Sequence, residues 1–288
     1  MKSSIRTHSA FTKLLVAAAA CAAFQRADAT LLFEDGFNYT AGSLGPANVS
    51  PAGLSGNAWA GGSSHITVAS GNLTYSGLED LGGNSVLDTW GVSAGSVYNT
   101  YTDQNSGSIY VSFLLNASVA PSASNYLLAL NPGTSTPNGS SDALQVDVQP
   151  GTGGYEVGLR TPGKSVTFDT TTVLSLNTTY LVVAEYTFGA AGVSSASLFL
   201  DPTPGASQPT AAVTLAGNGT VTDIANVGLK AQSSSTTGTF SLDNILIGTA
   251  WSDVTPTATA VPEPGSLSLV LAGMGALGFM ARYRRAGK

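Results

Sequence analysis

From residue 30 to about residue 255, short runs of strand-type sequence are separated by turns rich in Gly, Ser, Asn and Pro. Some of these runs are apolar throughout, and others alternate apolar with polar residues. The stretch shows no helical period. Residues 108–115 are apolar nearly throughout, as in a strand that is covered on both faces. Residues 142–149 and 155–160 instead alternate apolar with polar side chains, and residues 179–188 form the strongest strand pattern. This texture predicts about a dozen strands and no helix.

Alternating faces of this kind are buried when two sheets pack face to face, so the pattern predicts an all-β, two-sheet β-sandwich over residues 30–255. A single open sheet would leave one apolar face in water. A β-solenoid would show a repeat of fixed period, and none is present. The Pro-rich stretch 201–204 predicts a surface loop, because strand patterns resume after it.

The charge distribution excludes one class of partner. Charged residues make up only 10% of the chain, but the 43% hydrophobic content argues against disorder. Between the two ends of the chain the only basic residues are Arg160, Lys164 and Lys230, so the predicted sandwich is strongly acidic. Such a domain has almost nothing with which to neutralise phosphates, and we expect no nucleic-acid partner.

Cysteine and histidine usage excludes two further features. The single cysteine, Cys21, lies before the sandwich, so disulfides do not hold the fold together. The only histidines are His8 and His65, which excludes a Cys/His zinc site. A lipoprotein would use Cys21 as its acylated residue, but residues 18–20 lack the usual Leu three positions earlier.

Residues 1–29 have the three parts of a secretory signal peptide. Lys2, Arg6 and Lys13 form a positive region, an apolar run continues to residue 24, and residues 27–29 read Ala-Asp-Ala, an A-x-A cleavage site. An uncleaved buried helix is the alternative, but the run is short and its flanks suit a signal. We therefore expect export across the inner membrane by the Sec machinery and cleavage by signal peptidase.

The C-terminal region has a different character. Residues 256–261 form a Thr/Ala/Pro linker, which leads into Pro262, Glu263 and Pro264. The apolar run 266–281 predicts a transmembrane helix of roughly 24 Å, short for a hydrocarbon core of about 30 Å and weakened by glycines, as suits a transient anchor. It is followed by a basic cluster whose members are Arg282, Arg284 and Arg285. The positive-inside rule places this cluster in the cytoplasm and the sandwich outside.

Residues 262–288 resemble a PEP-CTERM sorting signal, because the Pro-Glu-Pro triplet, the apolar segment and the arginine cluster occur in the family's order at the extreme C-terminus. The resemblance implies a bacterium that makes extracellular polysaccharide. It also implies cleavage at or near the triplet by a membrane exosortase, followed by release or attachment at the cell surface. The alternative is a permanent single-span anchor with an accidental Pro-Glu-Pro.

A second, broader resemblance covers most of residues 30–255. The runs LLFEDGFNY, GSIYVSFLL, TYLVVAEYTF and FSLDNILIGTAWSDV resemble LamG-like, concanavalin A-like jelly rolls of bacterial surface proteins. This resemblance rests on strand texture, and residues 41–64 cannot be aligned with it. It implies a jelly-roll arrangement of the predicted sandwich.

The acidic residues argue against catalysis. Concanavalin-type sandwiches include glycoside hydrolases, which need two carboxylates that flank the sugar bond. The glutamates of the predicted sandwich are Glu34, Glu79, Glu156 and Glu185, and none lies in a Glu-x-Asp-x-Glu run. A Ser-His-Asp hydrolase would need His65, which has no nucleophile-elbow sequence near it. The sequence therefore predicts no catalytic residue and a protein that is not an enzyme.

Calcium is the one cofactor that the sequence motivates. Glu34 and Asp35 lie on the first strand, and Asp243 and Asn244 lie on the last. First and last strands commonly pair in jelly rolls, and carboxylate and amide oxygens suit Ca²⁺. Related carbohydrate-binding jelly rolls place a structural calcium in this sort of position. The alternative is that the four residues cap strand ends and face solvent.

Exposed aromatic rings would be needed to stack on sugars. Trp59, Trp90, Tyr98 and Tyr101 occur in loop-like Gly/Ser/Asn contexts and are the sugar-stacking candidates, whereas Trp251 follows the last strand and is expected at the edge of the core. The alternative is that the rings belong to the core, as aromatic residues of sandwiches usually do.

These observations predict an exported protein with a structural or adhesive role at the cell surface or in the exopolysaccharide matrix. The alternative function is a carbohydrate-binding, lectin-like module. The expected partners are exosortase, the membrane through the C-terminal helix, and extracellular polysaccharide.

Overall fold

A computed structural model of the chain describes residues 30–45, 57–133, 137, 139, 142–189, 194–216 and 221–258. The predicted signal peptide and the predicted sorting segment with its transmembrane helix lie outside these residues. Within the described ranges, no helix is both long and apolar enough to span a membrane.

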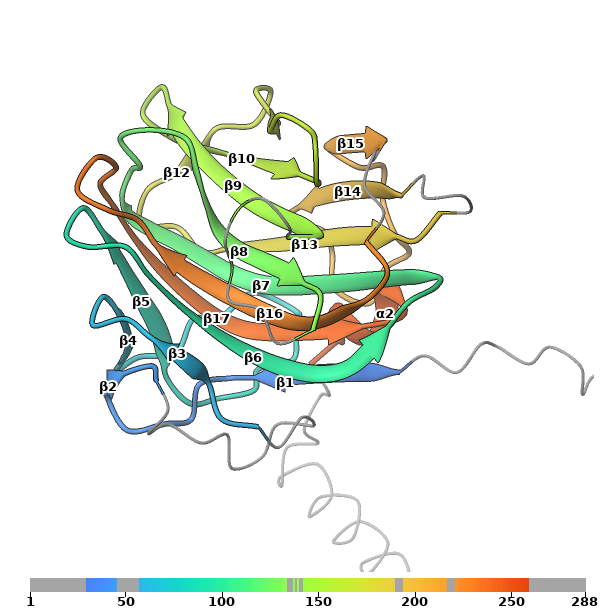
Figure 1. Ribbon diagram of the computed structural model, residues 1–288, viewed down its shortest axis with the longest axis horizontal. Coiled ribbons are helices and arrows are strands. Elements are labelled where there is room, and N and C mark those ends of the chain that lie inside the picture. Colours follow the sequence, from blue (N-terminus) through green and yellow to red (C-terminus); the bar gives the residue numbers. More distant parts are fainter. Residues whose placement is uncertain are drawn as a thin grey trace, which may run out of the picture.

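Two antiparallel sheets make up the fold (Figure 1). Sheet A contains, in spatial order, β15 (Val213–Ala216), β14 (Ser195–Leu200), β13 (Tyr180–Thr187), β7 (Ser108–Val119), β17 (Gly238–Gly248), β5 (Ser85–Trp90), β4 (Ile66–Ala69) and β2 (Gly42–Ser43), and β1 (Leu31–Asp35) pairs with β17. Sheet B contains β11 (Thr167–Phe168), β10 (Gly154–Arg160), β9 (Leu144–Gly151), β8 (Asn125–Asn131), β16 (Ile224–Ala231), β6 (Gly95–Gln104) and β3 (Ala60–Gly62), and β12 (Leu174–Ser175) pairs with β10.

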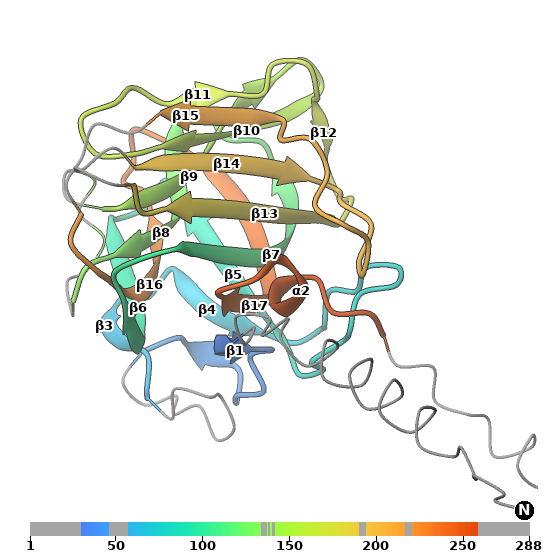
Figure 2. The same cartoon turned by 90° about the vertical axis from the view of Figure 1, so that its right-hand side faces the viewer.

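The main core fills the space between the two sheets, which confirms the predicted two-sheet sandwich (Figure 2). Strand β9 shows how the sequence pattern produces it. Leu144, Val146 and Val148 are fully buried in this core, and the residues between them point to the outer face of sheet B. The period-2 alternation of apolar side chains thus becomes one buried face of a sheet.

Strand β17 lies at the centre of sheet A. It pairs with β7 along its length, with β5 along its first half and with β1 along its second half. The β1 pairing sets Glu34 opposite Leu246 and Asp35 opposite Ile245. The first and last strands of the described domain therefore pair, as the sequence predicts.

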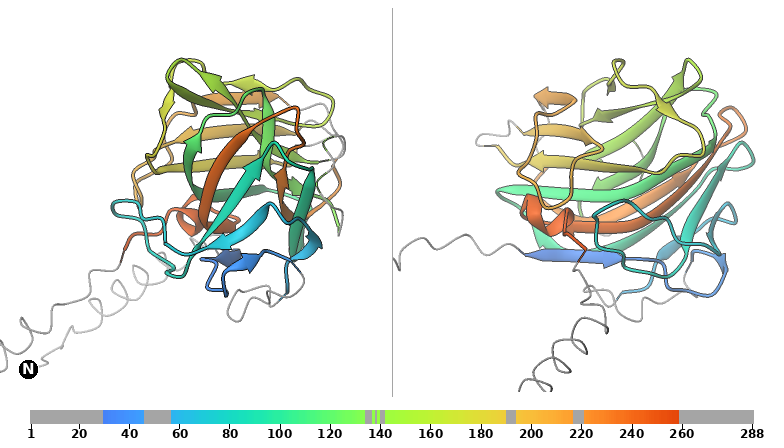
Figure 3. Two further views of the ribbon diagram at one scale, coloured as in Figure 1. Left: turned by 90° about the vertical axis from the view of Figure 1, so that its left-hand side faces the viewer. Right: turned by 180° about the vertical axis from the view of Figure 1, so that it is seen from behind.

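A second apolar cluster covers the outer face of sheet A. A short helix, α2 (Trp251–Val254), lies against β7 and β17 there (Figures 2 and 3). Trp251 makes edge-to-face contacts with Tyr110 and Phe199, which confirms that it packs at the edge of a core.

The expectation that residues 30–255 contain no helix is wrong at α2. This single turn is stabilised by the Asp253 carboxylate, which accepts hydrogen bonds from the N–H groups of Thr249 and Ala250 at 3.1 and 2.9 Å. Four residues are too few to produce a helical period in the sequence.

Candidate functional site

The predicted calcium residues lie on both faces of sheet A. Strand alternation points Asp35 inward, beside the core residue Ile245, and points Glu34 outward, beside Leu246 of the outer cluster. Asp243 pairs with Leu114, which also belongs to the outer cluster. The two pairs of residues therefore lie on neighbouring paired strands, β1 and β17, but they do not all face one point.

Asp35 accepts hydrogen bonds from buried groups of the core. Its carboxylate accepts hydrogen bonds from the Tyr39 hydroxyl at 2.6 Å, the Trp59 indole N–H at 2.8 Å and the Phe37 N–H at 2.8 Å. Burial raises the pKa of the Asp35 carboxyl, and these three hydrogen bonds act in the opposite direction. Asp35 is buried, so the alternative of a solvent-facing strand cap does not describe it.

Asp243 joins β17 to the loop formed by residues 70–83. Its Oδ2 accepts a hydrogen bond from Leu73 N at 2.8 Å, and its Oδ1 accepts one from Asn244 N at 2.7 Å. The side chain is fully buried. Burial raises the pKa of the Asp243 carboxyl to about 8, the two hydrogen bonds oppose this rise, and the nearby carboxylates of Asp80 and Asp35 add to it.

Two amide carbonyls beside Asp243 have no hydrogen-bond donor. The pairing of β17 with β7 shifts register just after Asp243, as at a β-bulge, and Asn244 adopts a positive φ of 47°. Asn244 donates from Nδ2 to the carbonyl oxygen of Glu79 at 3.2 Å, and Asn72 donates to Asp80 Oδ1 at 2.8 Å. The Oδ1 atoms of Asn244 and Asn72 are both buried, and neither has a hydrogen-bond partner among the residues that the structure describes.

These oxygens form what we call the outer acidic cluster, whose members are Glu34, Asn72, Glu79, Asp80, Asp243 and Asn244. Burial raises the pKa of Glu34, with added repulsion from the carboxylates of Glu79 and Asp35. The lysines and arginines of the described chain belong to sheet B, with Arg160 on β10, Lys164 between β10 and β11, and Lys230 on β16. Excess oxygen ligands and two unpaired amide carbonyls fit a hard cation such as Ca²⁺.

In the ranges that the structure describes, no three His, Cys, Asp or Glu side chains form a metal-binding group. A calcium ion at the outer acidic cluster would therefore depend on amide and main-chain oxygens as well as carboxylates. Asn72 and Asp80 were missed from the sequence as ligand candidates. The adjacent pair Glu79-Asp80 was the available signal, but nothing local shows that its loop folds over β17.

Three of the four predicted sugar-stacking rings lie in the core. Trp59, Trp90 and Tyr101 are 0%, 3% and 7% exposed. Trp90 donates its indole N–H to Asp88 Oδ2 at 3.0 Å and also contacts the Lys230 carbonyl at 3.1 Å. Their Gly/Ser/Asn neighbours resemble loops in the sequence, but the rings point inward, where no sugar reaches them.

Tyr98 is different, because it is half-buried on the outer face of sheet B. Its cross-strand neighbours are Gly228 on one side and Ala60 on the other, and Ala129 follows Gly228. Pro137 packs directly over Gly228, where an added Cβ would lie 2.0 Å from the Pro137 ring. Short side chains thus surround the tyrosine ring.

Polar residues lie in the adjacent cross-strand rows. Lys230 pairs with Ser96 on one side of the tyrosine row, and Asn226 pairs with Thr100 on the other. We call this surface the Tyr98 platform, made of Ala60, Ser96, Tyr98, Thr100 and Lys230. An amphipathic ring flanked by hydrogen-bonding groups is suited to a sugar, which presents C–H groups on its face and hydroxyls at its edge.

A second polar group on the outer face of sheet B was missed from the sequence. The Arg160 guanidinium donates to Gln145 Oε1 and lies over the Tyr126 ring, 5.9 Å from its centroid, and Gln145 donates to Asp142 Oδ2. Asp147 is 2% exposed, and its Oδ2 has no hydrogen-bond partner. Two features of the sequence could have indicated this polar group: the apolar–polar alternation of residues 142–149 and the rarity of arginine in the domain.

Electrostatics set this second group apart. Burial raises the pKa of the Asp147 carboxyl to about 7, the Arg160 charge lowers it and the Asp142 carboxylate raises it. Perturbed carboxyls often occur at active sites. Asp142 and Asp147 are only 3% and 2% exposed, however, so a substrate would have to enter a packed region to reach them.

The predicted PEP-CTERM sorting signal is confirmed by comparison with protein families, whereas the predicted transmembrane helix stays a prediction. Residues 260–285 match the family described as the PEP-CTERM protein-sorting motif. This motif indicates export, C-terminal sorting to the envelope or surface, and processing by exosortase. No curated protein matches the chain.

Several solved structures have a similar fold. An alginate lyase in complex with alginate tetrasaccharide is 12% identical, with a TM-score of 0.49 over 75% of this chain and 96% of that chain. An endo-β-1,4-glucuronan lyase from the fungus Trichoderma reesei is 14% identical, with a TM-score of 0.39 over 67% and 94%. A Trypanosoma rangeli sialidase is 13% identical, with a TM-score of 0.43 over 84% of this chain and 34% of that chain. All three TM-scores lie below 0.5, and nothing about this chain is inferred from them.

Proposed function

We propose that the protein is an exported, non-catalytic adhesive protein of the cell surface or exopolysaccharide matrix, and that it contacts polysaccharide through the Tyr98 platform. The sorting motif at residues 260–285 supports the destination. After exosortase processing, the sandwich would be the part that meets the matrix.

The observation that carries the proposal is the position of Tyr98. Of the four aromatic candidates, this ring alone is half-exposed, and it stands among Ala60, Gly228 and Ala129 with polar rows on both sides. A long strand face can accommodate several units of a polymer. Although Lys230 belongs to the platform, the domain as a whole is acidic and should favour a neutral polysaccharide over an anionic one.

Two groups in the described part of the chain could be mistaken for catalytic pairs, and the geometry of both supports a non-catalytic role. The Asp142 carboxylate lies close enough to raise the pKa of Asp147, but both side chains are buried. The Ser64 hydroxyl lies 3.2 Å from His65 Nε2 in an exposed position, and within the described chain no carboxylate hydrogen bonds to the His65 ring. Neither pair has the geometry of a hydrolytic site.

A structural calcium ion at the outer acidic cluster belongs to the same proposal. The carboxylates of Asp243 and Asp80 and the amide oxygens of Asn72 and Asn244 would hold it. The ion would neutralise the carboxylates and fix the loop of residues 70–83 against β17. Its contribution would be to stability and not to chemistry.

Affinity electrophoresis of the purified protein in gels that contain neutral or anionic bacterial polysaccharides tests the adhesive role. We expect retardation by a neutral polysaccharide, loss of retardation in Tyr98→Ala and its retention in Tyr98→Phe, which keeps the ring. Melting temperatures should be the same for all three proteins. Unchanged retardation in Tyr98→Ala would remove the platform from the proposal, and an absence of retardation by every polysaccharide would overturn the adhesive contact.

A further inference from the structure

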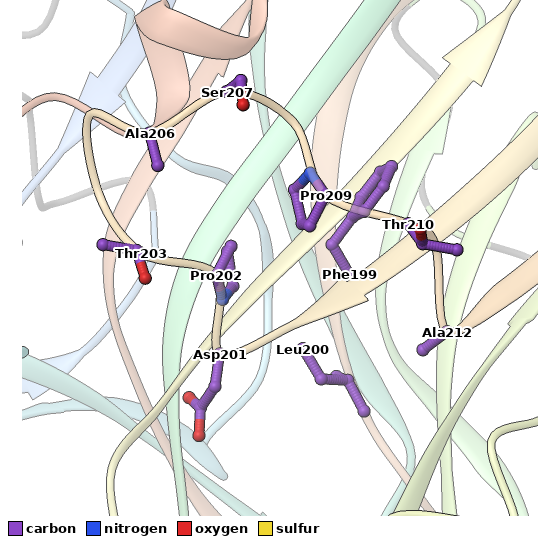
Figure 4. A pocket seen from close by; sticks show the side chains of 10 residues that line it. All are labelled: Phe199, Leu200, Asp201, Pro202, Thr203, Ala206, Ser207, Pro209, Thr210 and Ala212. Atoms are coloured by element: carbon purple, nitrogen blue, oxygen red, sulfur yellow. The ribbon is translucent and has the colours of Figure 1, made fainter.

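A hollow of about 280 Å³ lies under the loop formed by residues 201–212, at the end of β14 and beside the outer face of sheet A (Figure 4). The residues that line it are Phe199, Leu200, Asp201, Pro202, Thr203, Ala206, Ser207, Pro209, Thr210 and Ala212. The loop arches away from β14 and returns toward β15. The volume is near the lower end of the range for small-molecule sites, roughly 300–1,000 Å³.

Both ends of this loop are fixed to sheet A. Asp201 donates its N–H to the Leu181 carbonyl at 2.9 Å and accepts the Leu181 N–H on Oδ1 at 3.1 Å. At the other end, Ala212 N donates to the Leu198 carbonyl at 2.8 Å. The loop therefore begins and ends at defined positions in the sheet.

The middle of the loop is held as well. Gly205 N donates to the Thr255 carbonyl at 2.9 Å, and the Trp251 indole N–H donates to the Ala206 carbonyl at 2.9 Å. Three prolines restrict the backbone further, at positions 202, 204 and 209. A hollow framed by so constrained a backbone is pre-formed, and binding to it would lose little conformational entropy.

Three hydroxyl groups around the hollow have no partner in the described part of the protein. They belong to Thr203, Ser207 and Thr210, which are all exposed. Elsewhere in the domain comparable hydroxyls are used, as in Thr255, which donates to the Trp251 carbonyl at 2.9 Å. The hollow thus combines proline and alanine surfaces with free groups that can donate and accept hydrogen bonds.

The charges around the hollow exclude one ligand class. Asp201 is the only charged residue of the lining, and no basic side chain is present there. Its carboxylate also interacts with the Tyr75 hydroxyl, and burial raises its pKa. An anionic ligand would meet only repulsion and would find no guanidinium or ammonium partner.

We propose that this hollow is a binding site for one neutral pyranose unit, with the sugar's C–H face on the exposed ring of Pro209 and its hydroxyls on Thr203, Ser207 and Thr210. The site lies beside sheet A, whereas the Tyr98 platform lies on the outer face of sheet B. The inference is therefore independent of the proposed adhesive contact. With both surfaces, one molecule would bridge two polysaccharide chains and gain avidity without any new contact.

Backbone NMR titration of the purified protein tests the site. The neutral probes are methyl α-D-glucopyranoside and methyl β-D-galactopyranoside, and the anionic probe is methyl β-D-glucuronide. We expect saturable shifts of amides in residues 199–212 with at least one neutral probe, at millimolar concentration, and none with the glucuronide. An absence of saturable shifts with both neutral probes, or equal shifts with the glucuronide, overturns the proposal.

Variants locate the binding and separate the two proposals. Thr210→Val keeps the side-chain shape but removes one hydroxyl, and it should weaken sugar binding several-fold. Ala212→Phe should fill the hollow and abolish sugar binding. Thr214→Val, an exposed change on β15 outside the lining, is the matched control. Tyr98→Ala should leave these shifts intact. Equal weakening by Thr210→Val and Thr214→Val would contradict the site.

Discussion

The carboxylate of Asp243 accepts a hydrogen bond of 2.8 Å from the main-chain N–H of Leu73, a residue 170 positions earlier in the chain. This bond fastens the loop of residues 70–83 to the last strand and gathers Asn72 and Asp80 beside Asn244. Stability, ion binding and pH response should therefore all depend on this contact.

Calcium should stabilise the protein if the outer acidic cluster binds it. Saturation at about a hundred times the dissociation constant would add about 2.7 kcal/mol, which for a domain of this size raises the melting temperature by roughly 5–10 °C. Asp243→Asn should abolish the rise, while Asp103→Asn, an exposed change outside the cluster, should keep it. Calorimetry with Ca²⁺, Mg²⁺ or EDTA measures the effect. Identical melting curves of the unaltered protein in Ca²⁺ and EDTA would rule the ion out.

Without a metal ion, the protein should become more stable as the pH falls from about 8 toward 5. Burial raises the pKa of Asp147 to about 7 and that of Asp243 to about 8, so the folded state holds these protons more tightly than the unfolded chain does. The stabilisation is present at low pH and is lost as the pH rises through these values, by at most about 1.4 kcal/mol per pH unit for each group.

Urea unfolding in EDTA at pH 5 to 9 measures this dependence. Asp147→Asn should make the curve less steep between pH 5 and about 7. Saturating Ca²⁺ should make it less steep up to about pH 8, because the ion binds the ionised form of Asp243. A free energy of unfolding that increases from pH 5 to pH 8 in EDTA would contradict the assignment of these two carboxyls as buried and poorly paired.

Asp35→Ala should destabilise the core. It would leave the Tyr39 hydroxyl, the Trp59 indole N–H and the Phe37 N–H without their acceptor. Each unsatisfied buried donor costs about 1–3 kcal/mol, so we expect a loss of several kcal/mol in urea unfolding. Asp35→Asn keeps one acceptor oxygen and should lose less. Because Asp35 faces the core, Asp35→Asn should still show the rise in melting temperature that Ca²⁺ causes. Loss of that rise in Asp35→Asn would show that Asp35 belongs to the ion site.

Much of the fold followed from local pattern. The alternation around Leu144 and Val146 gave the buried face of β9, and the pairing of the first and last strands was predicted correctly. Side-chain direction was harder to predict. The small polar neighbours of Trp59 and Tyr101 suggested loops, because the sequence does not show which face of a strand is covered. Asn72 belongs to the outer acidic cluster because its loop contacts β17, a strand that is distant in the sequence. The residues near Asn72 in the sequence do not predict that contact.

Processing should depend on the Pro-Glu-Pro triplet. Replacing Pro262, Glu263 and Pro264 together with alanine should leave the full-length protein in the membrane fraction, because the exosortase would lose its recognition motif. Immunoblots of cell fractions measure this. Pro256→Ala, in the preceding linker, should be processed like the unaltered protein. Normal processing of the triple variant would show that the matched motif at residues 260–285 is not the processing signal.

The central position of β17 sets the order of events during export. In a chain exported from its N-terminus, β17 (Gly238–Gly248) would be the last of the described strands to emerge. Until it arrives, β1 and β5 have no partner that connects them to β7, so sheet A is divided into two incomplete halves. We therefore expect folding to be completed only when the sorting motif itself reaches the membrane, so that only a nearly complete chain would present a folded domain to the processing enzyme.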